Sequence, residues 1–236
     1  MSSDRCALLS ATFWEAGYQH LIETVHQRDA LARRNLDGLE IAVHDPGGAL
    51  LGEKSVDPRK EVLDLGALVE EIAGGAPRAM VTLEARYDQR VFPYRPHHYA
   101  FLHRPGSDAP PLYYAVNAVL GGVPDRIGAT TINNFETYVF RQRPFAARYA
   151  VLLGNLARFA AAEAQVATYY GGQRVLVEVA LAPKSHREID LPSERDGRRL
   201  ERVEVKALFR LASYVVGRRA DSGDLVLFDH LFTYIK

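Results

Sequence analysis

The chain has 236 residues, 47% of them hydrophobic and 25% charged, which is enough apolar material for one large or two small hydrophobic cores. Lys plus Arg and Asp plus Glu each total 29, so the net charge is zero. The chain therefore has no overall positive charge to attract nucleic acid or acidic lipid. The single cysteine, Cys6, excludes an intrachain disulfide scaffold. The N-terminus has no secretory pattern and no apolar run has the length of a membrane helix, so we expect a cytoplasmic protein without a membrane partner.

Alternation of apolar and polar residues with period two predicts β-strands over most of the chain. In the first half, Gly38–Asp45 and Ala79–Tyr87 each keep their apolar side chains on one face. In the second half, Gln173–Leu181 and Leu200–Phe209 do the same. Turn sequences rich in Gly, Asp and Pro separate the strand segments, so we expect an all-β fold.

One segment has helical spacing. Leu65, Leu68, Val69 and Ile72 lie at positions i, i+3, i+4 and i+7, and Gly74-Gly75 can cap the end. We therefore predict a short helix over residues 65–73. The second half of the chain has no matching segment, so the helix is an addition to the strand framework.

Two segments, 18–38 and 155–170, contain good helix formers, and the alanine run at Ala160–Ala162 favours helix locally. The two segments align with each other, and each lies ahead of a double glycine. These glycines are Gly47-Gly48 in the first half and Gly171-Gly172 in the second. We prefer strand, loop, strand for both, with a helix in one or both as the alternative.

The sequences of the two halves of the chain align with each other, which predicts an internal repeat. Ala42–Leu65 aligns with Val166–Leu191, including the double glycines and a shared Asp-Leu end. The difference in residue number between aligned positions decreases along the chain, so the first copy has longer connections between its strands. The alternation of apolar and polar residues nevertheless stays in step between the copies, as strands that keep one face in a core require. The later matches are Val81–Tyr87 with Val203–Phe209, and Tyr99–Arg104 with Tyr214–Arg219.

The repeat predicts two tandem antiparallel β-sandwich modules of seven or eight strands each, produced by an internal duplication. Residues 1–121 form the first module, with longer loops and the helix at 65–73, and residues 122–236 form the second. The segment Leu120–Asn134, with two glycines, a proline and few bulky residues, is the expected linker.

The second half resembles the small β-sandwich proteins of the sensory rhodopsin transducer type over Tyr149–Tyr234. The matching positions are Leu153, Asn155, Val166, Tyr169-Tyr170, Pro183, Leu191 and the Arg219–Ser222 turn. The resemblance implies an oligomeric sandwich module with a binding role, in some members for carbohydrate-like ligands. Two tandem copies with a helical insertion depart from the single-module pattern, so neither the oligomeric state nor any functional residue is carried across.

Three histidines, His97, His98 and His103, lie in one short stretch beside Arg95 and Arg104 and suggest a metal or anion site. Adjacent residues on a strand point to opposite faces, so His97 and His98 do not readily share an ion. A packed or solvated strand edge is the other interpretation of this stretch.

A second constellation combines His186 and Glu188 with the distant His230. Side chains at i and i+2 of a strand share a face, and two histidines with one carboxylate can hold non-haem Fe(II). The pattern is short, and no arginine follows His230 to hold an oxo-acid cosubstrate. An Fe(II) metalloenzyme is therefore the alternative function, not the preferred one.

The 12 tyrosines cluster, with adjacent pairs at Tyr113-Tyr114 and Tyr169-Tyr170. On a strand, such a pair directs one ring into the core and one to the surface. An exposed tyrosine suits sugar or protein recognition, although sandwich cores also use tyrosine simply for packing.

We expect a non-catalytic binding or assembly module with no cofactor, which recognises a glycan-like small molecule or a protein partner. A homo-oligomer stays open as a partner, and nucleic acid is not expected. The long connections of the first module are the expected binding region, because extended loops more often carry function. The candidate ligand-binding residues are Tyr94, Arg95, His97, His98, His103, Arg104 and Tyr114.

Overall fold

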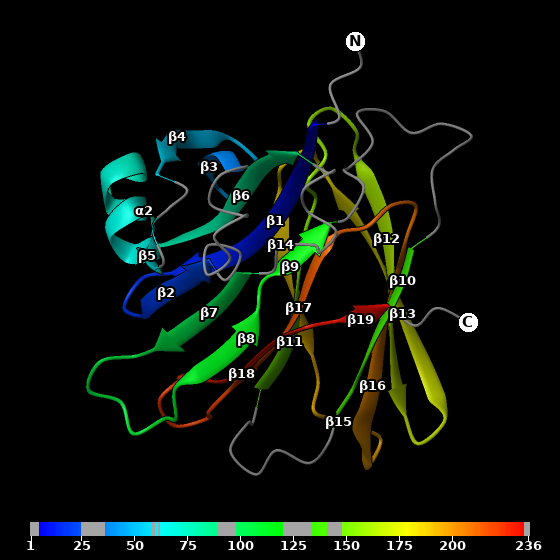
Figure 1. Cartoon of the computed structure of the whole chain (residues 1–236). Helices are drawn as coiled ribbons and strands as arrows, with labels where there is room; N and C mark the ends of the chain where they lie inside the picture. The colour runs from blue at the N-terminus through cyan, green and yellow to red at the C-terminus, as the bar shows by residue number, and fades with distance from the viewer. Residues whose placement is uncertain are drawn as a thin grey trace. The chain divides into compact units, whose positions relative to one another are not determined.

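The structure is a computed structural model and describes residues 5–24, 36–57, 60, 62–88, 98–119, 134–140 and 148–233. The all-β class is confirmed: the described residues form four antiparallel sheets and one helix (Figure 1). The chain divides into two compact units. Unit 1 comprises Met1–Gly106 and Pro111–Gly122, and unit 2 comprises Ser107–Pro110 and Val123–Lys236. Most of the expected linker, residues 120–133, lies outside the described residues.

Unit 1 contains two sheets, with strand orders β4-β3-β6-β1-β9 and β5-β2-β7-β8. Alternate residues of β3 and β6 are fully buried between the sheets, Ile41 and Leu83 among them, as the period-two pattern predicts. The elements are β1 (Arg5–Glu15), β2 (Gln19–Thr24), β3 (Leu36–His44), β4 (Leu50–Val56), β5 (Val62–Asp64), α2 (Leu65–Ala73), β6 (Arg78–Asp88), β7 (His98–His103), β8 (Leu112–Ala115) and β9 (Asn117–Val119).

Helix α2 has the bounds that the sequence predicts. Asp64 Oδ1 accepts the backbone N–H of Ala67 at 3.1 Å and so caps the first turn. Gly74 has φ 62°, in the left-handed region, and its N–H donates to Glu70 O at 3.0 Å. The apolar stripe that includes Leu68 is buried. Among the described residues there is no helix with the length and apolar character needed to span a bilayer.

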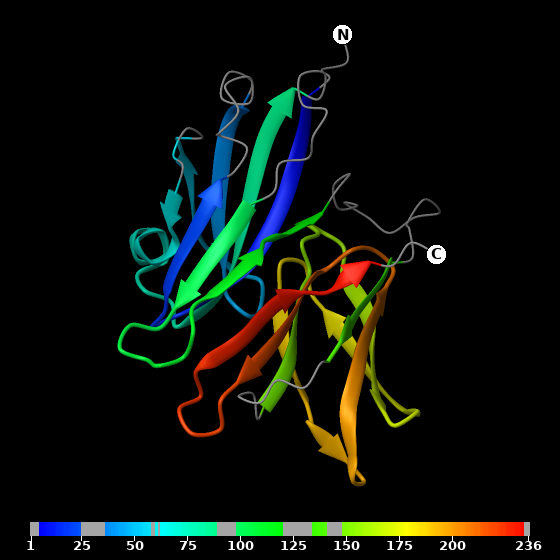
Figure 2. The same ribbon diagram turned by 60° about the horizontal axis from the view of Figure 1, so that its bottom comes forward.

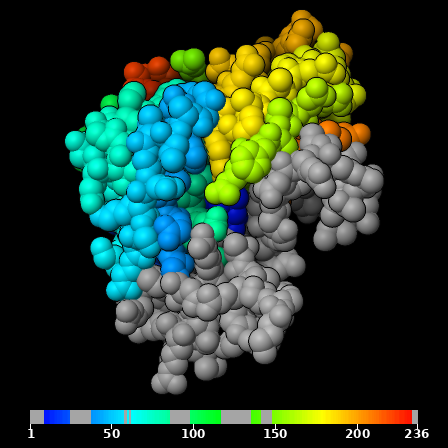
Figure 3. All heavy atoms as spheres, turned by 90° about the horizontal axis from the view of Figure 1, so that it is seen from above, coloured from blue at the N-terminus to red at the C-terminus, as the bar shows by residue number. Residues whose placement is uncertain are grey.

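Helix α2 lies beside β4, and Figure 3 shows the atoms of the two elements in contact on the surface of unit 1. The approach is close at Gly52 of β4, where a Cβ atom would lie 2.5 Å from the backbone oxygen of Ile72. This position therefore requires glycine because there is no space for a side chain.

Unit 2 also contains two sheets, with orders β13-β12-β16-β10-β19 and β14-β11-β17-β18, and the short β15 pairs with β16 (Figure 2). Its core draws on both sheets, for example Val166 and Val205 on one and Val151 and Val215 on the other. The strands are β10 (Asn134–Val139), β11 (Arg148–Gly154), β12 (Ala162–Tyr170), β13 (Gln173–Leu181), β14 (His186–Leu191), β15 (Glu194–Arg195), β16 (Arg198–Ala207), β17 (Ala212–Arg218), β18 (Leu225–His230) and β19 (Phe232–Thr233).

The two units have the same strand order. Replacing β1–β9 in turn by β10–β14 and β16–β19 converts the sheets of unit 1 into those of unit 2. The aligned segments Val81–Tyr87 and Val203–Phe209 lie in β6 and β16, the middle strands of their sheets. Each unit has more strands than the seven or eight expected, because several are only two or three residues long. The shared order is what a duplication predicts, while the duplication itself stays a prediction.

The first helix-prone segment has strands at both ends, β2 and β3, whereas the second follows β11 directly, begins as a loop and continues as β12. Residues 25–35 lie outside the described part of the first segment, between β2 and β3. In the second, Asn155 organises the loop between β11 and β12: its Nδ2 lies 2.8 Å from Ala160 O and its Oδ1 accepts the N–H of Ala157 at 2.9 Å. Ala162 and Ala164 then face the core with period two, so the alanine-rich segment is a strand despite its helix propensity.

Candidate binding face

Aromatic side chains gather on the outer face of the sheet β5-β2-β7-β8 in unit 1. Leu21, Phe101 and Tyr113 are paired in one row across the sheet, and Glu23 and Tyr99 in the next. Directly paired residues project to the same side, so these side chains share one face. The alternate residues face the core and are buried. We call the set Leu21, Glu23, Tyr99, Phe101, His103 and Tyr113 the aromatic face.

Two tyrosine rings form the centre of the aromatic face. Tyr99 and Tyr113 are stacked, with ring centroids 5.5 Å apart and an interplanar angle of 5°. Tyr113 is 62% exposed, and its hydroxyl donates to Glu23 Oε2 at 3.0 Å. Phe101 and His103 make a tilted contact at 6.4 Å beside them. The ring of Tyr113 is therefore accessible, and its orientation is fixed by the half-buried ring of Tyr99 and by Glu23.

The inner side of the same sheet carries a buried polar chain. Tyr114 Oη lies 2.6 Å from Thr12 Oγ1 on the facing sheet and 2.7 Å from His20 Nε2. Trp14 stacks on the imidazole of His20 at 6.4 Å. Complete burial lowers the pKa of His20 to about 3, so the ring is neutral at physiological pH. These contacts join the two sheets of the sandwich and serve its stability.

The predicted ligand residues separate into three groups. Tyr114 and His98 are buried on the inner side, which corrects their assignment to a surface site: the strand alternation directs both inward. His103 belongs to the aromatic face, and Arg104 follows it with its guanidinium 5.8 Å from the ring centroid of Tyr18. Tyr94, Arg95 and His97 lie outside the described residues.

Sequence reasoning missed Tyr99, Phe101, Tyr113 and Glu23 as members of a site. The signal was available, because Tyr99, Phe101 and His103 alternate at i, i+2 and i+4, and one ring of the Tyr113-Tyr114 pair had to be exposed. The pattern did not show which ring that was.

The proposed iron ligands are not brought together. Glu188 on β14 pairs with Leu152, which pairs with Tyr214, which pairs with His230 on β18. Three strand spacings separate Glu188 from His230, roughly 14 Å, too far for one ion. The described residues contain no group of three or more His, Cys, Asp or Glu side chains that could hold a metal ion. The Fe(II) triad is therefore not assembled, because β11 and β17 lie between its members.

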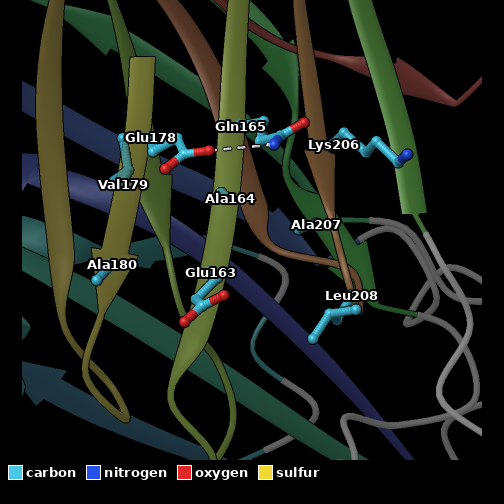
Figure 4. Close-up of a pocket in the computed structure, with 9 residues that line it drawn as sticks. All are labelled: Glu163, Ala164, Gln165, Glu178, Val179, Ala180, Lys206, Ala207 and Leu208. Carbon is cyan, nitrogen blue, oxygen red and sulfur yellow. Dashed lines mark hydrogen bonds between the residues drawn. The ribbon is translucent and has the colours of Figure 1, made fainter. Parts of the chain in front are cut away.

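A hollow of about 510 Å³ lies on the outer face of β12, β13 and β16 in unit 2 (Figure 4). Its polar side chains are Glu163, Gln165, Glu178 and Lys206, and Gln165 Nε2 donates to Glu178 Oε1 at 3.3 Å. The hollow is wide open and aromatic rings do not line it. With these polar side chains, the hollow is more typical of a solvent-exposed sheet face than of a ligand-binding site.

Farther along the same face, Arg202 lies over the ring of Tyr169 at 4.1 Å. The Tyr169 hydroxyl donates to Glu204 Oε2 at 2.6 Å, and this hydrogen bond raises the pKa of Tyr169. Arg202 also pairs with Glu204 at 3.2 Å. The three side chains satisfy one another, so the cluster offers less to a ligand than the exposed ring of Tyr113.

No family model, curated protein or solved structure matches this chain, so the resemblance to sensory rhodopsin transducer-like sandwiches stays a prediction.

Proposed function

We propose that this protein is a non-catalytic carbohydrate-binding module that holds a glycan against the aromatic face of unit 1. The observation that carries the proposal is the exposed ring of Tyr113, which stacks on Tyr99 and donates its hydroxyl hydrogen bond to the carboxylate of Glu23. No cofactor enters the proposal. A cytoplasmic location, favoured by the single cysteine, is part of it.

The chemistry of the face matches that of a sugar. A pyranose ring has a face of C–H groups that packs on an aromatic ring, and hydroxyls around its rim that need hydrogen-bond partners. Tyr113 supplies the exposed ring, and Glu23 supplies a carboxylate next to it. His103, and Gln19 in the paired position on β2, add further polar groups at the edge.

The face is also rigid enough to bind at low entropic cost. A tyrosine side chain has only two rotatable angles to fix, and here the ring of Tyr113 is held by the stack on Tyr99 and by its bond to Glu23. Such preorganisation reduces the ordering cost of association. The zero net charge of the chain favours a neutral ligand over a highly charged one.

The test is a glycan array probed with the full chain, followed by calorimetry with the best ligand. Tyr113→Ala is expected to lower affinity at least tenfold, since it removes the exposed ring. Tyr113→Phe keeps the ring but loses the bond to Glu23, so an intermediate loss is expected. Phe159→Ala is the matched control, because Phe159 is 70% exposed but lies in unit 2.

The proposal is refuted if the folded wild-type chain binds no glycan on the array, or if Tyr113→Ala binds as well as the wild type. If the aromatic face binds a protein and no glycan, the face is a protein-docking site instead. Circular dichroism of each variant confirms that it is folded.

A further inference from the structure

Strand β13 of unit 2 is a long, exposed sheet edge. Among the described residues it pairs with β12 alone, over nine residues. Leu176 and Val177 are 43% and 44% exposed. The strand contains no proline, no lysine and no bulge, which are the usual features that keep an edge from pairing with another strand. Its two charged side chains, Arg174 and Glu178, are of opposite sign, whereas β14, at the edge of the other sheet, carries Arg187, Glu188 and Asp190 in six residues.

The turn before β13 determines which backbone groups point outward. Gly171 and Gly172 have φ of 54° and 85° and form a two-residue turn, so Tyr170 and Gln173 are its closing, hydrogen-bonded pair. Hydrogen-bonded pairs alternate along an antiparallel ladder. The backbone N–H and C=O groups of Arg174, Leu176 and Glu178 therefore point away from β12.

We propose that a second copy of this chain adds to this edge, with β13 pairing antiparallel to its own copy about a two-fold axis at Leu176. Leu176 then lies opposite itself, and each Arg174 lies opposite the second copy's Glu178. On the other side of the sheet, Val175 lies opposite the second copy's Val177. A two-fold contact of this kind uses one patch twice and closes without leaving a free edge.

The charges select this register. The sequence Arg-Val-Leu-Val-Glu over residues 174–178 is self-complementary only when it is centred on Leu176. A shift of two residues keeps the outward backbone groups opposed but places Leu176 opposite a charged side chain and leaves the other charge unmatched. The Gln165–Glu178 bond uses one carboxylate oxygen, and the other is left for arginine.

Charge reversal tests the pairing in the full chain by sedimentation equilibrium. Arg174→Glu creates two like-charged pairs across the axis, and so does Glu178→Arg, so each is expected to raise the dimer dissociation constant about tenfold. The double variant Arg174→Glu/Glu178→Arg restores opposite charges and is expected to return to near the wild-type value. Arg187→Glu on β14 is the matched control and should leave the constant unchanged.

Cross-linking tests the register directly. In a Cys6→Ser background, Leu176→Cys places two thiols opposite each other, where the spacing of paired Cα atoms, about 5.5 Å, fits a disulfide. Oxidation should give a covalent dimer, whereas Arg174→Cys, four residues from its own copy, should not. A monomeric wild-type chain up to about 0.5 mM, or a double charge variant no tighter than the single ones, would overturn the proposal.

Discussion

Replacing Asn155 by alanine is expected to destabilise unit 2 strongly. The side chain is fully buried, and its amide lies within hydrogen-bond distance of Ala160 O, Leu181 O and Ala182 O. Its Oδ1 also accepts the N–H of Ala157. It therefore fixes the β11–β12 loop against the end of β13.

The magnitude follows from the groups left without a partner. Ala182 O also accepts from Ser185, so that carbonyl keeps a hydrogen bond in the variant. The N–H of Ala157 and the carbonyl of Ala160 lose theirs, and each buried polar group left unsatisfied costs about 1–3 kcal/mol. We expect a loss of about 2–5 kcal/mol in the free energy of unfolding, or about 10 °C or more in the midpoint.

Urea denaturation followed by circular dichroism measures the loss. Trp14, the single tryptophan, is in unit 1, so its fluorescence reports that unit separately. Gln165→Ala is the control, since it removes an amide with one exposed hydrogen bond and should cost about 0.5 kcal/mol. A loss below about 1 kcal/mol for Asn155→Ala would refute the reasoning, because the loop would then satisfy its own backbone groups.

Two further changes act on unit 1. Gly52→Ala should lower the free energy of unfolding of unit 1 by about 1–3 kcal/mol, because the added Cβ would lie 2.5 Å from the backbone oxygen of Ile72. An unchanged unfolding midpoint, followed by Trp14 fluorescence, would show that α2 moves away freely. The second concerns His20, whose pKa falls from 6.5 to about 3 on folding, so the unfolded chain binds a proton that the folded chain does not. Stability from this group is therefore full above pH 6.5 and falls by about 1.4 kcal/mol per pH unit down to about pH 3. The stability advantage of the wild type over His20→Gln should shrink over that window in urea titrations; a constant difference would mean that folding does not lower the pKa of His20.

The sequence predicted those elements whose signals are local. Helix α2 was found to the residue because Asp64, the apolar spacing from Leu65 and the left-handed Gly74 all mark the same bounds. The strands of the repeat were found because the apolar phase survives changes in loop length. The alanine-rich segment was ambiguous locally, and the core contacts of Ala162 and Ala164 decided it.

The site was harder to predict because β7 is apolar on both faces. Tyr99 and Phe101 alternate with Ala100 and Leu102, so period two does not tell which set is inside. The structure puts the smaller residues in the core along with His98, and the larger rings outside. Likewise, the distance between Glu188 and His230 depends on the order of four strands, which neither local sequence contains.

The shared framework leaves different surfaces open in the two units. Tyr99 of unit 1 is partly exposed beside Tyr113, whereas its aligned counterpart Tyr214 in unit 2 is fully buried. Function in such a pair is determined by particular faces and edges, not by the fold. A dimer joined at β13 would carry two aromatic faces, and two linked sites bind a dense glycan surface with avidity when both reach it at once. Arg174→Glu should then weaken binding to an immobilised glycan but leave the affinity for a soluble monovalent one unchanged, whereas Tyr113→Ala should weaken both. Equal losses in both assays for Arg174→Glu would mean that the edge and the aromatic face are not separate sites.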